Sequence, residues 1–355
     1  MNSECPQKLS DLDNHFRQSS LEGNWRWFSV NEMKIGGKGW NHTACHFSRL
    51  PAEFQKDVRE VIWDLSQHSA GIYIDFETEA TSLAARWSLR LETSLAEQMP
   101  ATTIGGLDLY GWNSGEWTWC ATGQFNSFKQ NESILLEGME KSLHRFRLYL
   151  PLYNGIDRLE IGVPEGYSID QASPLARQTY CIYGTSIVQG GCASRAGMSY
   201  PAILGRLTGA EIINLGFSGN ARMEPELVNI LAEVNANTFI LDPLPNMSAH
   251  LIKERYLSFV QTLHKRRPDA ELVLVEQLPR QSGWIRPDHA REVSEKNAIL
   301  RTIYDNLKQT IPTCIRYVPG DGIIDNGDAT TDGLHLNDIG FRKFAQHLHQ
   351  HLTID

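Results

Sequence analysis

The pattern of hydrophobic and polar positions changes its period near residue 166. Before that point apolar and polar residues alternate one by one, most clearly in residues 72–77, 83–91 and 146–152. A period of two is typical of antiparallel strands with one face on a core and the other in solvent. Only residues 53–66 have a helical pattern, and a long irregular connection is the alternative there. Many short strands between Gly and Asn turns favour an all-β sandwich, of jelly-roll type.

After residue 166, short apolar runs and helical patterns follow one another. The runs are rich in β-branched residues, as buried parallel strands are, and span residues 180–183, 212–215, 239–241, 272–275 and 315–318. Helical spacing of apolar residues occurs in residues 227–234, 252–263, 293–307 and 341–348. This alternation predicts an α/β domain with a five-stranded parallel sheet covered by helices on both faces.

The change of period divides the chain into two predicted domains. A β-sandwich domain, with a short lead-in, is expected over residues 1–170, and an α/β domain over residues 171–355. Residues 168–178, which contain Pro174, are the expected linker. A length of 355 residues exceeds that of one average domain and agrees with two.

Charge and composition exclude some partners. A net charge of -9 disfavours a nucleic-acid binder, because binding to phosphates requires a basic face. The polar N-terminus lacks the apolar core of a signal peptide, and no apolar run reaches the length of a membrane span. We therefore expect a cytoplasmic protein with no membrane partner. Its six cysteines have no CxxC spacing, which favours free thiols over disulfides or a zinc site.

Candidate chemistry lies after the predicted parallel strands. Ser186 follows the first, Gly219 the second and Asn246 the third, while Asp332 and His335 follow the last. In such a sheet the loops after successive strands meet at one edge. A serine becomes a nucleophile when a base such as His335 takes its proton, and Asp332 would orient and stabilise that imidazole. The backbone N–H groups of Ser186 and Gly219 and the side-chain amide of Asn246 would hold an oxyanion. These residues predict a serine hydrolase, and no cofactor is expected.

Each candidate has a simpler explanation when taken alone. Gly219 fits an ordinary turn, Asn246 a cap, and Asp332 with His335 a turn before a helix capped near Asn337. Only their order after the first, second, third and last strands favours catalysis. The G-x-S-x-G elbow of α/β-hydrolases is excluded because Val188 stands where the second glycine is required.

Other reactive or charged residues were weighed against the same site. Cys192 is expected to be a packed thiol rather than a second nucleophile. The histidines of the last helix, at positions 347, 349 and 351, are expected to be solvated rather than metal-bound. Arg195 and Arg222 lie in loops that should flank the pocket, so they are candidate substrate-binding residues, with surface salt bridges as the alternative.

These blocks give the C-terminal half a family resemblance. Residues 178–352 resemble the SGNH (GDSL-like) hydrolases, whose signature Ser, Gly, Asn and His come from four separate blocks. The resemblance implies a flavodoxin-like three-layer α/β/α domain, and it assigns Ser186 as nucleophile, His335 as base, Asp332 as its partner, and Gly219 and Asn246 as oxyanion donors. The usual Gly-Asp-Ser of the first block is here Gly184-Thr185-Ser186.

The N-terminal half has a resemblance of its own. Gly106-Leu107-Asp108-Leu109-Tyr110 is similar to the GxDLY motif of the β-sandwich that precedes certain SGNH esterases, and residues 149–154 fit the same pattern. Together the two resemblances imply a two-domain esterase without a metal.

The expected function is hydrolysis of a carboxylic ester through an acyl-enzyme on Ser186. A small acyl group such as acetyl, on a sugar or another polar alcohol, is the expected substrate. The same site would also serve an acyltransferase, and a carbohydrate-binding protein with a vestigial hydrolase domain is a third hypothesis. Eight of the nine tryptophans lie in the N-terminal half, where filling of the sandwich core is favoured over stacking on sugars.

Overall fold

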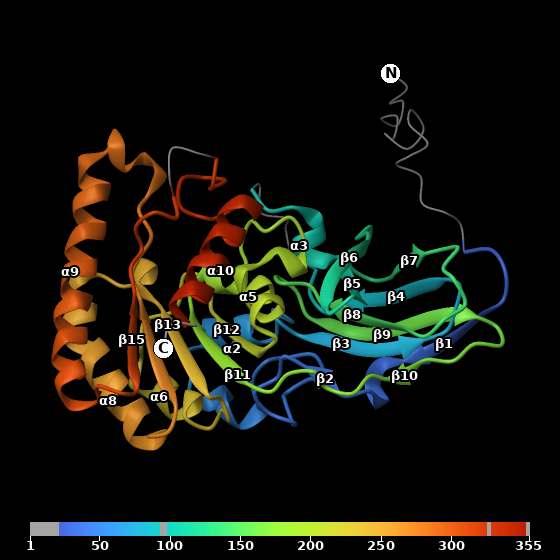
Figure 1. The fold of residues 1–355 in the computed structure, drawn as a ribbon, viewed down its shortest axis with the longest axis horizontal. Coiled ribbons are helices and arrows are strands. Elements are labelled where there is room, and N and C mark those ends of the chain that lie inside the picture. The colour runs from blue at the N-terminus through green and yellow to red at the C-terminus, as the bar shows by residue number, and fades with distance from the viewer. Residues whose placement is uncertain (1–20, 93–97, 325–327, 353–355) are drawn as a thin grey trace.

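Two halves lie side by side along the long axis of the molecule (Figure 1). The computed structural model describes residues 21–92, 98–324 and 328–352. One half is built of antiparallel strands, and the other of a parallel sheet with helices on both faces. The α/β and β-sandwich architectures predicted from the sequence are both confirmed.

The antiparallel half contains two sheets. The four-stranded sheet has the order β1 (Trp25–Ser29), β9 (Ile156–Pro164), β4 (Leu83–Leu89) and β7 (Asn131–Leu136). The second has the order β10 (Asp170–Gln171), β3 (Tyr73–Thr78), β8 (His144–Tyr149), β5 (Leu107–Asn113) and β6 (Glu116–Gly123), and β2 (Ile35–Gly36) also pairs with β3. Alternate residues such as Phe76, Trp87 and Ile161 fill the core between the sheets.

Much of the outer face of the second sheet is buried rather than solvated. Tyr73, Tyr110 and Tyr149 point away from the sandwich core and pack instead with the helices and strands of the α/β half. Asp75 and Arg147 on the same face are also buried. The expectation that these strands face solvent on one side is therefore wrong for this sheet, because its polar and aromatic face is the surface on which the two halves meet.

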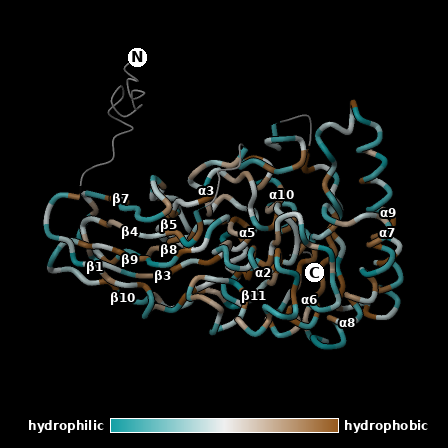
Figure 2. Tube along the Cα trace, turned by 180° about the vertical axis from the view of Figure 1, so that it is seen from behind, coloured by the Kyte–Doolittle hydropathy of each residue, from teal (hydrophilic) through white to brown (hydrophobic). Residues whose placement is uncertain are grey.

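The parallel sheet has the order β12 (Glu211–Gly216), β11 (Thr179–Gly184), β13 (Thr238–Asp242), β14 (Glu271–Val275) and β15 (Ile315–Val318). Because successive side chains of a strand point to opposite faces, each strand contributes to two cores. Tyr183 and Leu274 belong to one core and Ile182 and Val273 to the other. The hydrophobic residues in Figure 2 accordingly follow the strands in the interior of each half.

Helices cover both faces of this sheet. One face is covered by α6 (Pro225–Leu231), α8 (Leu257–Arg266) and α9 (Pro287–Thr310), with α7 (Ala249–Leu251) and a π-helical segment (Ile252–Tyr256) leading into α8. The other face is covered by α5 (Tyr200–Thr208) and α10 (Asp338–Leu352). Helix α5 was not predicted, since Pro201 and Gly205 interrupt its pattern, although a proline in the first turn suits a helix start.

Parts of the N-terminal half pack with the α/β half. Residues 53–66 form a 3₁₀ helix (Ala52–Lys56) and α2 (Glu60–Ser66), and a short helix, α3 (Ala101–Gly105), precedes β5. Leu50, Phe54 and Ile62 belong to the core under α6 and α8. Strand β10 lies in the expected linker and spans the boundary drawn at residue 170. A division by sequence position alone therefore separates segments that pack together.

The tryptophan side chains of the N-terminal half do not pack where the sequence predicted. Of those in the N-terminal half, only Trp87 belongs to the buried sandwich core, so the prediction that most of them fill it is wrong. Trp40 and Trp63 pack against the α/β core, while Trp112 and Trp119 are 39% and 48% exposed. In the described ranges of the chain, none of the helices combines the length and apolar character that a membrane span requires.

Candidate active site

Ser186 opens a single helical turn at the carboxyl end of the first parallel strand. This turn, α4 (Ser186–Gln189), begins at Thr185, whose hydroxyl accepts the N–H of Ile187 at 3.2 Å. Asp and Thr are both good N-cap residues, which explains why Thr185 can stand in a position that is usually Asp. Gly190 ends the turn with a φ of 103°, a conformation that glycine adopts without strain.

The loop before α10 brings His335 to Ser186. Ser186 Oγ lies 2.9 Å from His335 Nε2, and His335 Nδ1 lies 2.7 Å from Asp332 Oδ2. Asp332 Oδ1 accepts the backbone N–H groups of Leu334 and His335. Partial burial opposes ionisation of Asp332, but hydrogen bonds from the His335 ring and from both backbone groups outweigh it and hold its pKa below the ordinary value. The carboxylate is therefore charged and fixes the orientation of the imidazole.

Gly219 and Asn246 lie on the loops after the next two strands. Gly219 has a φ of 69° and open space where a Cβ would be, so the backbone conformation, rather than crowding, favours glycine there. Asn246 ends a 3₁₀ helix (Leu244–Asn246) after β13. Its Oδ1 accepts the N–H of Ala221 at 3.2 Å, which commits the oxygen and leaves the amide nitrogen as the donor. The amide group thus ties the Asn246 loop to the Gly219 loop.

Arg195 connects the two halves. Its Nη1 donates to Asp108 Oδ2 at 2.8 Å and to the Tyr110 hydroxyl at 2.7 Å. Asp108 is fully buried and also accepts the N–H of Gly197 and the indole N–H of Trp119. Burial raises the pKa of Asp108 against the opposing pull of Arg195. Arg195 thus contacts both the Asp and the Tyr of the GxDLY motif, and its role as a substrate ligand stays a prediction.

Other predicted candidates remain outside this constellation. Arg222 is exposed, and its carbonyl accepts a hydrogen bond from Arg255, so its role stays a prediction. Burial, with Asp332 nearby, raises the pKa of Cys192 to about 11, which keeps the thiol protonated. His347 and His351 bond to backbone carbonyls. Over the three described stretches, no group of three His, Cys, Asp or Glu side chains is placed to hold a metal ion.

Residues that the sequence reasoning missed support the site from beneath. Arg49 is buried and donates to the carbonyls of Asn214 and Gly216 at the end of β12. Burial lowers its pKa to about 9, so the guanidinium is still charged at neutral pH. Burial and the nearby Arg49 lower the pKa of His68 to about 3, and its neutral ring contacts Gln189 Nε2 at 3.0 Å. Among sequence features, only the glycine pair at 190 and 191 pointed to close packing here.

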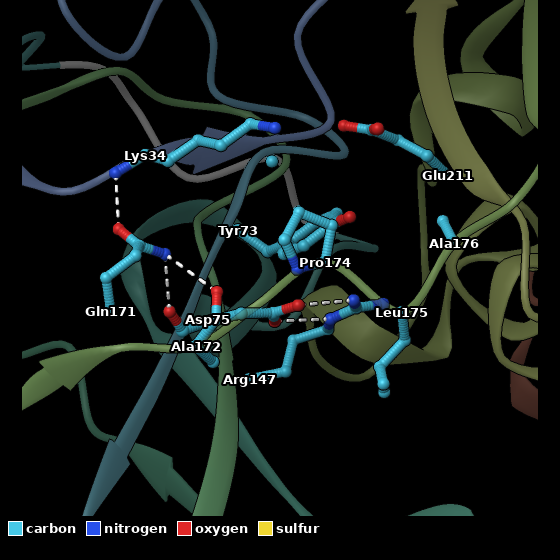
Figure 3. Close-up of a pocket in the computed structure, with 11 residues that line it drawn as sticks. Lys34, Tyr73, Asp75, Arg147, Gln171, Ala172, Pro174, Leu175, Ala176 and Glu211 are labelled. Atoms are coloured by element: carbon cyan, nitrogen blue, oxygen red, sulfur yellow. Dashed lines mark hydrogen bonds and ion pairs between the residues drawn. The ribbon is translucent and has the colours of Figure 1, made fainter.

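A separate pocket lies at the opposite end of the parallel sheet, between the sandwich, the linker and the start of β12 (Figure 3). Arg147 and Asp75 form a bidentate pair with both N–O distances at 2.7 Å. Glu211 lies on the far wall and accepts the N–H of Gly37. The space inside is about 30 Å³, enough for about two water molecules. The pocket lies between packed elements, at the end of the parallel sheet away from Ser186.

Family comparisons agree with this architecture. Residues 177–353 match the GDSL-like lipase/acylhydrolase family, and residues 25–169 match the GxDLY family, the N-terminus of SGNH-hydrolase-type esterases. No curated protein matches the sequence.

Three solved structures are similar over almost the whole chain. A protein described as a GDSL-like lipase from Bacteroides ovatus has 30% identity and a TM-score of 0.87, covering 92% of this chain and 96% of that one. A salicylyl-acyltransferase from a tetracycline biosynthetic pathway has 15% identity and a TM-score of 0.71, with 92% and 96% covered. A family two carbohydrate esterase from Cellvibrio japonicus has 12% identity and a TM-score of 0.59, with 93% and 97% covered. The last two show a shared fold.

Proposed function

The chain belongs to the GDSL-like lipase/acylhydrolase family of ester-hydrolysing enzymes, and from this premise we propose that it is a serine esterase acting through an acyl-enzyme on Ser186. The observation that carries the proposal is the continuous hydrogen-bonded path from Ser186 through His335 to Asp332, with contacts of 2.9 and 2.7 Å. The substrate in this proposal carries a small acyl group, such as acetyl, on a sugar or another polar alcohol.

In the first step Ser186 Oγ attacks the ester carbonyl while His335 Nε2 takes its proton. The carbonyl oxygen becomes an oxyanion, held by the N–H groups of Ser186 and Gly219 and by the amide of Asn246. Collapse of this intermediate breaks the bond to the alcohol, which leaves with the proton from His335. Water then attacks the acyl-enzyme with His335 again as base, and releases the carboxylic acid and free Ser186.

The test compares wild type with Ser186→Ala on p-nitrophenyl esters of increasing acyl length and on acetylated sugars. Wild type should turn over the short esters fastest. Ser186→Ala should lower kcat by about 10⁴-fold or more, because removal of the nucleophile abolishes the acyl-enzyme route. Equal turnover by the two proteins would remove Ser186 as the nucleophile, whereas an absence of turnover in wild type would favour the binding-protein hypothesis.

Acyl transfer to another alcohol uses the same site, and the acyltransferase stays an alternative. A competing alcohol added to the assay distinguishes the two activities by product. Free acid as the main product at high alcohol concentration supports the esterase, whereas a new ester as the main product supports the transferase.

A further inference from the structure

The segment that joins β8 to β9, residues 150–154, reaches from the sandwich to the underside of the catalytic edge. Leu150 packs in the sandwich core and Leu152 in the core of the α/β half. The carbonyl of Leu152 accepts a hydrogen bond of 3.1 Å from Nε2 of Gln189, the last residue of α4. This segment, which we call the tip, therefore contacts the helical turn that begins with Ser186.

Two glycines after α4 leave room for the tip. A Cβ at Gly190 would lie 2.6 Å from Leu152 Cδ1, and a Cβ at Gly191 would lie 2.8 Å from the Tyr153 hydroxyl. Contacts this close require the neighbouring atoms to move. The glycine pair of one half thus matches the side chains that the other half inserts.

The Tyr153 hydroxyl joins two parts of the catalytic edge. It donates to the carbonyl of Ser186 at 3.4 Å, and the Ser218 side chain lies close to the same hydroxyl. Burial raises the pKa of Tyr153, so the hydroxyl keeps the proton that it donates. A bond of this length has room to shorten once substrate is bound. Ser218 directly precedes Gly219, so one phenol contacts both segments that carry backbone oxyanion donors.

A second contact, made by Gln189, also joins α4 to the Gly219 loop. Gln189 Oε1 accepts the N–H of Ser218 at 3.0 Å, so the end of α4 is also tied to the Gly219 loop through the backbone. Gln189 is completely buried and takes its remaining contacts from Leu152 and His68 of the N-terminal half. The relative position of the two oxyanion donors is therefore set by groups from both halves.

We propose that Tyr153 is a positioning residue for the oxyanion hole: by joining the Ser186 carbonyl to Ser218, it fixes the spacing of the Ser186 and Gly219 N–H groups. The inference rests on the proposed function, because it concerns how the same site stabilises its intermediate. Donors that are already in place stabilise the oxyanion without reorganisation during the reaction. The sandwich half thus contributes to catalysis through a residue that does not touch the reacting atoms.

The first test is Tyr153→Phe in the full chain. We expect kcat for p-nitrophenyl acetate to fall about tenfold with KM within about twofold, because misplaced donors weaken the transition state more than the ground state. The inhibition constant of a boronic acid, which forms a tetrahedral adduct with serine, should rise by a similar factor. Labelling with a fluorophosphonate counts the reactive Ser186 sites, so kcat is expressed per labelled site.

Tyr256→Phe is the matched control. Tyr256 is fully buried, whereas Tyr153 is partly buried; like Tyr153 it donates to a backbone carbonyl at 3.4 Å, but its acceptor is Leu241, within β13. The Tyr256→Phe substitution likewise removes a phenolic oxygen that donates to a backbone carbonyl. It should leave kcat per labelled site within about twofold of wild type. An equal loss in both variants would overturn the positioning role, since general loosening of the core would then explain it.

Gly191→Ala gives a second, independent variant. The new methyl group would meet the Tyr153 hydroxyl, so it should displace that hydroxyl and lower kcat in the wild-type background. In the Tyr153→Phe background the hydroxyl is absent and the contact at 3.3 Å with the Ser186 carbonyl remains, so Gly191→Ala should lower kcat by a smaller factor than it does in the wild-type background. If kcat of the double variant falls by the product of the factors seen in the two single variants, the two residues act separately and the inference is overturned.

These outcomes separate the inference from the proposed function. If wild type hydrolyses no ester, or Ser186→Ala remains active, the proposed function fails. If both of those tests succeed but Tyr153→Phe keeps the wild-type kcat per labelled site, only the inference about Tyr153 fails.

Discussion

Two buried Asp–Arg pairs lie on the same face of the six-stranded sheet. One pair joins two strands of that sheet, and the other joins the sheet to the α/β half. Asp75 and Arg147 are register partners on the adjacent strands β3 and β8, so their bidentate contact stays within the sandwich. Asp108 is on β5 of the same sheet, but its partner Arg195 comes from the loop after α4. Similar chemistry therefore stabilises a sheet in one place and joins the two halves near the proposed catalytic residues in the other.

The loop that carries Arg195 is tied onward to the histidine. Ser194 donates its N–H at 2.8 Å to Asp338, which begins α10 shortly after His335. On its other side, Ser194 accepts a hydrogen bond from Thr102 of the N-terminal half. A change at Arg195 can thus reach the His335 loop through Ser194 and Asp338, whereas the hydrogen bonds of the Arg147 side chain go to Asp75 within the sandwich.

Arg195→Met should have the largest effect. It leaves Asp108 buried without its cation, and breaking a buried pair typically costs about 3–5 kcal/mol of stability. Because the Ser194–Asp338 contact is disturbed as well, kcat per labelled site should also fall about tenfold. Urea unfolding and p-nitrophenyl acetate turnover measure the two effects. A stability loss with unchanged kcat would mean that this contact only docks the halves.

Arg147→Met should match that loss of stability without the loss of activity. It leaves Asp75 without its cation and removes a guanidinium that lies 3.8 Å from the centre of the Tyr73 ring and 4.6 Å from that of Trp117. We expect a similar decrease of about 3–5 kcal/mol in the free energy of unfolding. The kcat per labelled site should stay within about twofold of wild type. A tenfold loss of kcat here would contradict the distinction between the two pairs.

The sequence predicted one side of this comparison far better than the other. The five parallel strands and the approach of Ser186 to His335 follow from hydrophobic period and from the rule that strand ends meet at one edge. Arg195 was visible as a loop arginine, but its partner Asp108 is 87 positions away on another half. A contact of that kind depends on how two finished halves dock, and no local pattern in the chain records it.

Tyr153, Arg49 and the outer sheet face were hidden for the same reason. Alternation correctly separated the two faces of β3 and β8, but it could not show that the polar face is covered by the α/β half. Arg49 lies in an irregular stretch, where no period exists to place it. A short strand such as β10, with two residues, is likewise defined only by the neighbour with which it pairs.

Asp242 is a third buried acid, at the end of β13, and it has no arginine partner. Burial raises its pKa to about 8, with the Tyr200 hydroxyl opposing the shift. An unfolded Asp loses its proton near pH 4, so between about pH 4 and pH 8 the folded chain holds a proton that the unfolded chain has released. The contribution of Asp242 to stability should therefore fall as the pH rises through this window.

Asp242→Asn removes this titration and keeps an acceptor for Tyr200. The melting temperature of the variant minus that of wild type should increase steadily from pH 5 to about pH 8. Thermal unfolding across this range tests the sign directly. A constant difference would show that Asp242 ionises in the folded protein as it does when unfolded, so that burial without a cation has no special consequence.

The smallest effect is expected from Glu211→Gln, which changes a contact between the halves that has no cation and lies far from Ser186. Glu211 Oε1 accepts the N–H of Gly37 at 3.1 Å, and a glutamine keeps an oxygen in that place. Only the difference between a charged and a neutral acceptor is lost, about 1 kcal/mol of stability. The kcat per labelled site should not change, because Glu211 is at the amino end of β12 while the catalytic loops follow the carboxyl ends. If Glu211→Gln lowered kcat as much as Arg195→Met, any loosening between the halves would suffice to disturb catalysis, and the special position of the Asp108–Arg195 pair would be lost.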